Sequence, residues 1–159
     1  MVCIKKSLFM FIICLTFVVF AGCGKRSDSL DRNAQSASPP TLTILYQDTS
    51  MNAVRGTYHW TYANHDGTET TIEFDSSAPP ELVKGASPLN VSPKSSLAFS
   101  FSDKPSDLSV SIWEENQSVQ QAVVDNTIVT PELKGYAVYE ITGTWVQGTV
   151  TYAFVVYVN

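Results

Sequence analysis

The chain has 159 residues, and its 15 acidic residues outnumber 10 Lys and Arg to give a formal net charge of −5. Beyond residue 26 the basic residues are scattered singly. Because tracking a phosphate backbone requires clustered Lys and Arg, we do not expect nucleic acid as a partner.

The first 22 residues have the three-part pattern of an export signal. Lys5 and Lys6 form a short positive region, and the uncharged, mostly apolar run Ser7–Gly22 follows and leads to Cys23. A run of about 16 residues is shorter than the roughly 20 that a membrane-spanning helix requires. We therefore expect residues 1–22 to act as a signal peptide.

Residues 20–23, Phe-Ala-Gly-Cys, resemble the lipobox of bacterial lipoproteins, with Phe20 in place of the usual Leu or Val. The resemblance implies cleavage between Gly22 and Cys23 and transfer of a diacylglyceryl group, with palmitate-like acyl chains, to the Cys23 sulfur. The product would be lipid-anchored at the extracytoplasmic face of the cell membrane. An uncleaved signal-anchor helix and an ordinary signal peptide remain the alternatives.

Cleavage would change both charge and cysteine content. It removes Lys5 and Lys6 and no acid, leaving eight basic against 15 acidic residues, a net charge of −7. Cys3 and Cys14 leave with the signal and Cys23 is lipidated, so no disulfide, thiolate metal site or cysteine nucleophile is expected. The remaining 137 residues suit one domain that can build its own core.

The segment after the signal, 23–40, is predicted to be a flexible tether that starts at the lipidated cysteine. It is rich in Ser and charged residues, Leu30 is its one large apolar residue, and Pro39-Pro40 end it. Such a composition buries too little surface to fold by itself. The folded domain is expected at 41–159.

Strand patterns begin at the start of that domain. Alternation or β-rich composition predicts strands over 41–46, 56–62 and 68–74, the last two joined by a turn at Asp66-Gly67. The Pro-rich stretch 75–93 is predicted to be irregular apart from a short strand at 89–91.

The second half of the domain continues in the same way. Strands are predicted over 96–102, around Leu108, Val110 and Ile112, and over 119–124 and 127–129. The clearest hairpin pairs 136–145 with 149–158 across a turn at 146–148, and Tyr152, Phe154, Val156 and Val158 share one face.

Seven to nine strands at this spacing predict an all-β fold, a single antiparallel β-sandwich of immunoglobulin-like or fibronectin-like type. Helical periodicity is absent after the signal peptide.

One stretch of the domain carries a family resemblance. Tyr58-x-Trp60-Thr61-Tyr62, Asp66-Gly67 and the run 79–83, Pro-Pro-Glu-Leu-Val, with a Tyr-rich final hairpin, resemble small uncharacterised Bacillus-type lipoproteins with an immunoglobulin-like domain. The resemblance implies a Gram-positive cell surface and no particular chemistry.

The candidates for chemistry are few. His59 and His65 could contribute to a metal site. His65 and Asp66 could also act as a catalytic pair with a serine, but no Gly-x-Ser-x-Gly motif is present. Glu114-Glu115, as strand neighbours, should point to opposite faces. Asp66, Asp75 and Glu81 do not form a calcium loop. We predict no catalytic residues, no metal and no cofactor.

Aromatic residues are numerous for a small domain, and Tyr58, Trp60 and Tyr62 share one strand face. That face is expected in the core, and its alternative is a candidate binding face for an envelope protein or polymer. We therefore expect a non-enzymatic, membrane-anchored binding lipoprotein. A surface hydrolase and a small-ligand or metal-sensing lipoprotein are the alternatives.

Overall fold

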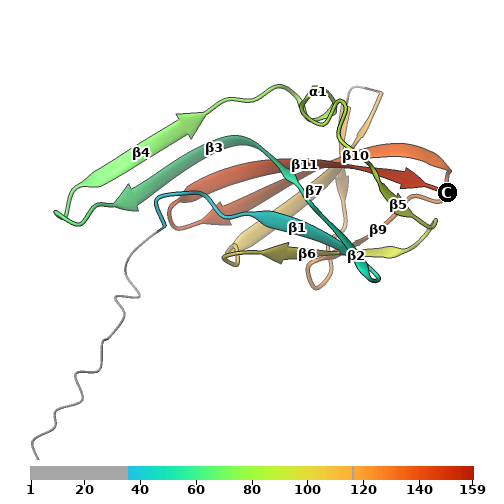
Figure 1. The fold of residues 1–159 in the computed structure, drawn as a ribbon, viewed down its shortest axis with the longest axis horizontal. Helices are drawn as coiled ribbons and strands as arrows, with labels where there is room; N and C mark the ends of the chain where they lie inside the picture. The colour runs from blue at the N-terminus through green and yellow to red at the C-terminus, as the bar shows by residue number, and fades with distance from the viewer. Residues whose placement is uncertain (1–35, 116) are drawn as a thin grey trace, which may run out of the picture. The chain divides into compact units, whose positions relative to one another are not determined.

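The computed structural model describes residues 36–115 and 117–159, which fold almost entirely into β-strands (Figure 1). Within these ranges there are eleven strands and one short helix. In chain order they are β1 (Leu42–Tyr46), β2 (Thr49–Asn52), β3 (Val54–Ala63), β4 (Glu69–Phe74), α1 (Pro79–Leu82), β5 (Leu89–Val91), β6 (Ser96–Phe101), β7 (Asp107–Glu114), β8 (Gln117–Gln121), β9 (Thr127–Val129), β10 (Gly135–Trp145) and β11 (Gly148–Val158).

The strands form two sheets that pack as a sandwich. The smaller sheet has the order β2-β1-β6-β9, and the larger has the order β4-β3-β11-β10-β7-β8. Neighbouring strands are antiparallel except that β5 pairs in parallel with the end of β11. The predicted antiparallel β-sandwich is confirmed. Its immunoglobulin-like or fibronectin-like type stays a prediction.

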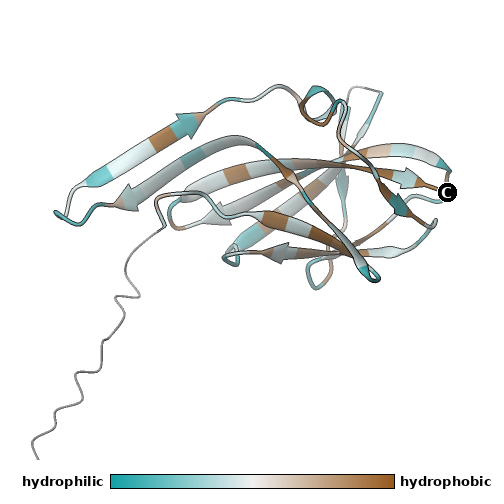
Figure 2. Ribbon diagram, viewed as in Figure 1, coloured by the Kyte–Doolittle hydropathy of each residue, from teal (hydrophilic) through white to brown (hydrophobic). Residues whose placement is uncertain are grey.

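The core lies between the sheets and depends on period-two alternation, visible along the strands in Figure 2. In β11, Tyr152, Phe154 and Val156, which were predicted to share one face, are buried at 1% exposure or less. Phe154 stacks on Tyr139 of β10 with ring centroids 4.9 Å apart, and it meets Phe99 of β6 edge-on at 6.4 Å. Each large apolar side chain buried in this way stabilises the fold by about 1.5–3 kcal/mol.

The outer face of the larger sheet is partly covered by segment 75–88, which contains α1. Leu82 and Val83 form a second apolar cluster with Ala153 and Val155, the outward-facing residues of β11. The helical turn α1 occurs although the domain's sequence has no helical periodicity. A single turn is too short to show helical periodicity, and it begins at a proline, whose fixed φ suits the first turn of a helix.

The strand count also differs from the seven to nine predicted. Strand β2 was missed because its residues are polar and mostly exposed, with no alternation to reveal it. It is defined by its pairing with β1. The strand predicted over 119–124 lies earlier, at β8, and Val124 forms an isolated bridge with Thr127.

The end of the predicted tether is bonded to the sandwich. Pro39 and Pro40 are buried, and the Pro40 carbonyl accepts a 2.7 Å hydrogen bond from the Tyr152 hydroxyl. The Ser36 carbonyl accepts the Trp60 indole N–H at 2.9 Å. Segment 36–40 therefore belongs to the domain and not to the tether, while the predicted signal peptide and the remainder of the tether lie outside the described residues.

Two buried tyrosines offer a matched test of these contacts. The Tyr139 hydroxyl is buried with no hydrogen-bond partner among the described residues, whereas the Tyr152 hydroxyl bonds Pro40. A buried polar group without a partner is costly, and a satisfied one is stabilising. We expect Tyr152→Phe to lower the free energy of unfolding by about 1–2 kcal/mol and Tyr139→Phe to leave it unchanged or raise it by up to about 1 kcal/mol. Urea unfolding measures both, and equal losses would contradict the assignment.

Candidate functional site

Three aromatic residues lie on the uncovered part of the outer face of the larger sheet. Tyr136 of β10 pairs directly with Tyr157 of β11, and Val138, two residues along on the same face, pairs with Trp113 of β7. The neighbouring loop 130–134 adds Leu133. We call Trp113, Leu133, Tyr136 and Tyr157 the aromatic surface.

The aromatic surface is open to solvent. Leu133 is 82% exposed and Tyr136 is 73% exposed, and the Tyr136 and Tyr157 rings lie 4.9 Å apart between centroids. Grouped exposed apolar residues are unusual on a soluble domain and mark contact sites, where Tyr and Trp contribute much of the binding energy.

A hollow of about 330 Å³ adjoins this surface, and Trp113, Leu133 and Tyr136 contribute to its wall. Its volume lies near the lower end of the range of volumes found for ligand pockets. The loop on one side of it is fixed at its start by Thr130, a buried residue whose hydroxyl donates to the Ser92 carbonyl and accepts from the Ser95 N–H, both at 2.8 Å. The hollow can therefore receive an apolar side chain or ring against a positioned wall.

The indole of Trp113 is oriented by a carboxylate. Its N–H donates to Glu140 Oε2 at 3.1 Å, and both residues are half-buried on the outer face. A hydrogen bond to a charged acceptor contributes about 1.5–3 kcal/mol. This interaction favours one orientation of the Trp113 indole ring.

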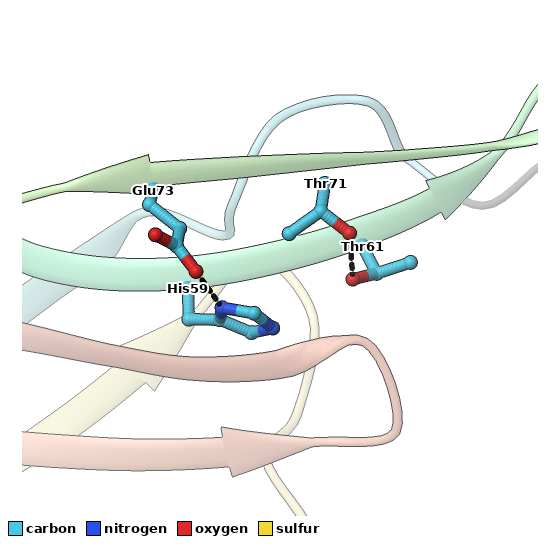
Figure 3. Close-up of polar contacts among 4 residues, drawn as sticks. All are labelled: His59, Thr61, Thr71 and Glu73. Carbon is cyan, nitrogen blue, oxygen red and sulfur yellow. Dashed lines mark hydrogen bonds and ion pairs between the residues drawn. The ribbon is translucent and has the colours of Figure 1, made fainter.

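A set of hydrogen-bonded polar side chains, distinct from the Trp113–Glu140 pair, lies on β3 and β4 (Figure 3). His59 Nδ1 is 2.9 Å from Glu73 Oε1, and the Thr61 and Thr71 hydroxyls are 2.8 Å apart. His59 is exposed, whereas its neighbour Trp60 in β3 is buried. With side chains 54% and 75% exposed, the His59–Glu73 pair is a solvated surface contact that contributes little stability.

The other candidate residues do not form one site. Asp66 accepts hydrogen bonds from the Thr68 hydroxyl and N–H at 2.7 and 3.0 Å, which lowers its pKa and assigns it to the turn. Glu81 pairs with Lys84 at 3.2 Å. Glu114 ends β7, and Glu115 follows in a left-handed turn conformation. Among residues 36–115 and 117–159, no three His, Cys, Asp or Glu side chains are grouped to hold a metal ion.

Trp60 lies in the core, not on an exposed binding face. It is 1% exposed and meets Trp145 edge-on at 5.7 Å. Tyr58 and Tyr62 are half-buried against the core, and Tyr58 stacks on Phe74 at 5.6 Å. Of the two alternatives for this strand face, the core is the one that the position of Trp60 supports.

Sequence reasoning did not single out the aromatic surface, although a signal was present. In β10 the inward residues are Ala137, Tyr139 and Ile141, so alternation places Tyr136 on the opposite face. The exposure of Leu133 has no such local signal, because it lies in a loop.

Comparisons with protein-family models, with curated proteins and with solved structures found no match to this chain.

The contrast between buried and exposed aromatic residues gives a stability test. We expect Trp60→Ala to lower the free energy of unfolding by about 3–5 kcal/mol. Leu133→Ser and Tyr136→Ser should each change it by less than about 0.5 kcal/mol, because both side chains are exposed. Urea unfolding followed by circular dichroism measures all three, and a large loss in either serine variant would place that residue in the core.

Proposed function

We propose that this chain is a membrane-anchored lipoprotein on the extracytoplasmic side of the cell. Its β-sandwich would bind an envelope protein or polymer through the aromatic surface. The proposal has two independent parts, the anchor and the contact surface.

The anchor rests on the sequence, since residues 1–35 lie outside the described residues. The positive residues, the apolar run and the Phe-Ala-Gly-Cys sequence ending at Cys23 support export, cleavage and lipidation. Two acyl chains would hold the protein firmly, because each buried methylene contributes about 0.8 kcal/mol. Within the part of the chain that the structure describes, no helix qualifies as a bilayer span.

The contact surface rests on one observation, the exposure of Leu133 and Tyr136 beside a 330 Å³ hollow. Exposing apolar area of this kind lowers solubility unless a partner covers it. The surrounding charges are mixed, with Glu114, Glu132 and Lys134 in the wall of the hollow. The partner proposed is therefore one that presents an apolar or ring-shaped group with a polar rim.

The anchor is tested by replacing the sulfur atom that would carry the lipid. We expect Cys23→Ser to abolish incorporation of a palmitate analogue and to release the protein from the membrane fraction or leave it unprocessed, since serine carries no thiol. Cys14→Ser should change neither result, because Cys14 lies inside the signal. Intact-mass measurement of the wild type should show a chain that begins at Cys23, and a mass retaining residues 1–22 would contradict the cleavage.

The contact surface is tested by photo-crosslinking on intact cells followed by mass spectrometry. A partner crosslinked to the wild type should be lost, by about tenfold or more, with Leu133→Ser combined with Tyr136→Ser, because contact residues of this type carry about 1.4 kcal/mol or more each. Val146→Ser is the matched control, since Val146 is 94% exposed and outside the aromatic surface. Equal crosslinking in all three proteins would place the contact elsewhere.

A further inference from the structure

A second cavity lies under segment 76–82, where it crosses the outer face of the larger sheet. Its volume is about 190 Å³. The strands contribute Thr57, Glu140 and Thr151 to its wall, and the segment contributes Ser76, Pro79 and Leu82. The cavity is separate from the aromatic surface, and a ligand could occupy it whether or not that surface has a partner or Cys23 carries a lipid.

The covering segment is held at close range, so the cavity is a fixed feature of the fold. The Ser76 N–H donates to Thr57 Oγ1 at 3.1 Å. Gly56 permits the approach, because a Cβ at that position would lie 2.7 Å from Thr151 Oγ1 and 3.1 Å from Ser76 Oγ. Leu82 and the following Val83 then pack on the sheet.

The hydroxyl protons of this wall are already used within the fold. The Thr151 hydroxyl donates to the Thr57 carbonyl at 3.0 Å, and the Ser76 hydroxyl donates to the Ser77 carbonyl at 3.0 Å. Since the Ser76 proton is committed there, the 3.3 Å contact between the Thr57 and Ser76 hydroxyls uses the Thr57 proton. These three oxygens can therefore act as acceptors toward a ligand in the cavity.

Glu140 adds a negative charge to this acceptor wall. It is the one charged residue among the described residues that line the cavity. One of its oxygens, Oε2, accepts the Trp113 indole N–H, and none of the ion pairs formed by residues 36–115 and 117–159 involves Glu140. A half-buried carboxylate that forms none of these ion pairs is free to pair with a positive group brought by a ligand.

We propose that this cavity binds a primary ammonium group on a short alkyl stem, with Glu140 as its counter-ion. An ammonium has three donors and no acceptor, which matches a wall of acceptors. The methylene groups of the stem would lie against Pro79, Leu82 and Ala153, the apolar part of the wall. The ammonium can come from a free alkylamine or from a lysine side chain.

Other ligand classes fit less well. An anion would meet the Glu140 carboxylate, and a neutral alcohol would bring lone pairs of its own to an acceptor wall. Calcium takes six to eight oxygen ligands, commonly from several carboxylates, whereas this wall holds one.

The test follows the amide and indole signals of the full-length, ¹⁵N-labelled chain in detergent micelles during titration. The probes are butylammonium, Nα-acetyl-lysine methylamide, 1-butanol, sodium and calcium. We expect saturable shifts of Thr57, Thr151 and the Trp113 indole N–H with the two ammonium probes, because Trp113 shares the Glu140 carboxylate. Tighter binding of butylammonium points to a free amine, and tighter binding of the lysine derivative points to a side chain.

The decisive variant is Glu140→Gln, which keeps an oxygen for Trp113 and removes the charge. We expect it to weaken ammonium binding by about tenfold or more. Glu81→Gln removes one charge from the same segment, outside the cavity wall, and should bind like the wild type. If Glu140→Gln fails to fold, Thr151→Val replaces it as an isosteric loss of one acceptor and should weaken binding several-fold.

Three results with the ammonium probes and 1-butanol would overturn the proposal. These are no saturable shift in the wild type, binding of 1-butanol as tight as that of butylammonium, or unchanged ammonium affinity in Glu140→Gln. The proposal would also be overturned if sodium or calcium caused equal shifts and competed with butylammonium. The site would then bind cations in general, and the alkyl stem would contribute nothing to binding.

Discussion

Strand β11 is buried on both faces, and much of the domain depends on that constraint. Its inward residues Tyr152 and Phe154 fill the space between the sheets, while Ala153 and Val155 on the opposite face require a second cover. Its register with β10 extends over the whole strand and is fixed by a two-residue turn. Gly148 begins β11 at φ +147, and a Cβ there would collide with the His59 carbonyl. A slip of one residue would exchange the two faces, so register and burial enforce each other.

The second cover divides the outer face of the larger sheet into two regions. Where segment 75–88 lies on β11, it forms one side of the cavity that Glu140 lines. Where the cover is absent, Tyr136 and Tyr157 remain in solvent. The hydrogen bond from Trp113 to Glu140 joins the two regions, since one residue belongs to the aromatic surface and the other to the cavity wall.

The start of the domain is coupled to its core. The carbonyls of Ser36 and Pro40 accept hydrogen bonds from Trp60 and Tyr152, two of the most buried aromatic residues. If Cys23 carries the lipid, the chain from Cys23 to Ser36 can extend at most about 45 Å. The proposed binding surfaces would then work close to the membrane, which favours partners anchored in or near the envelope.

The sequence by itself determined the β class, the last hairpin, the Asp66-Gly67 turn and the short strand at Leu89–Val91, because alternation and turn chemistry are local properties. For the candidate site it indicated only that aromatic residues are plentiful. Tertiary structure decided that Trp60 is core and Tyr136 is surface, that α1 covers β11, and that Glu140 meets Trp113. Each of these depends on which distant segment lies over a given strand face, and that information is absent from the alternation of any one strand.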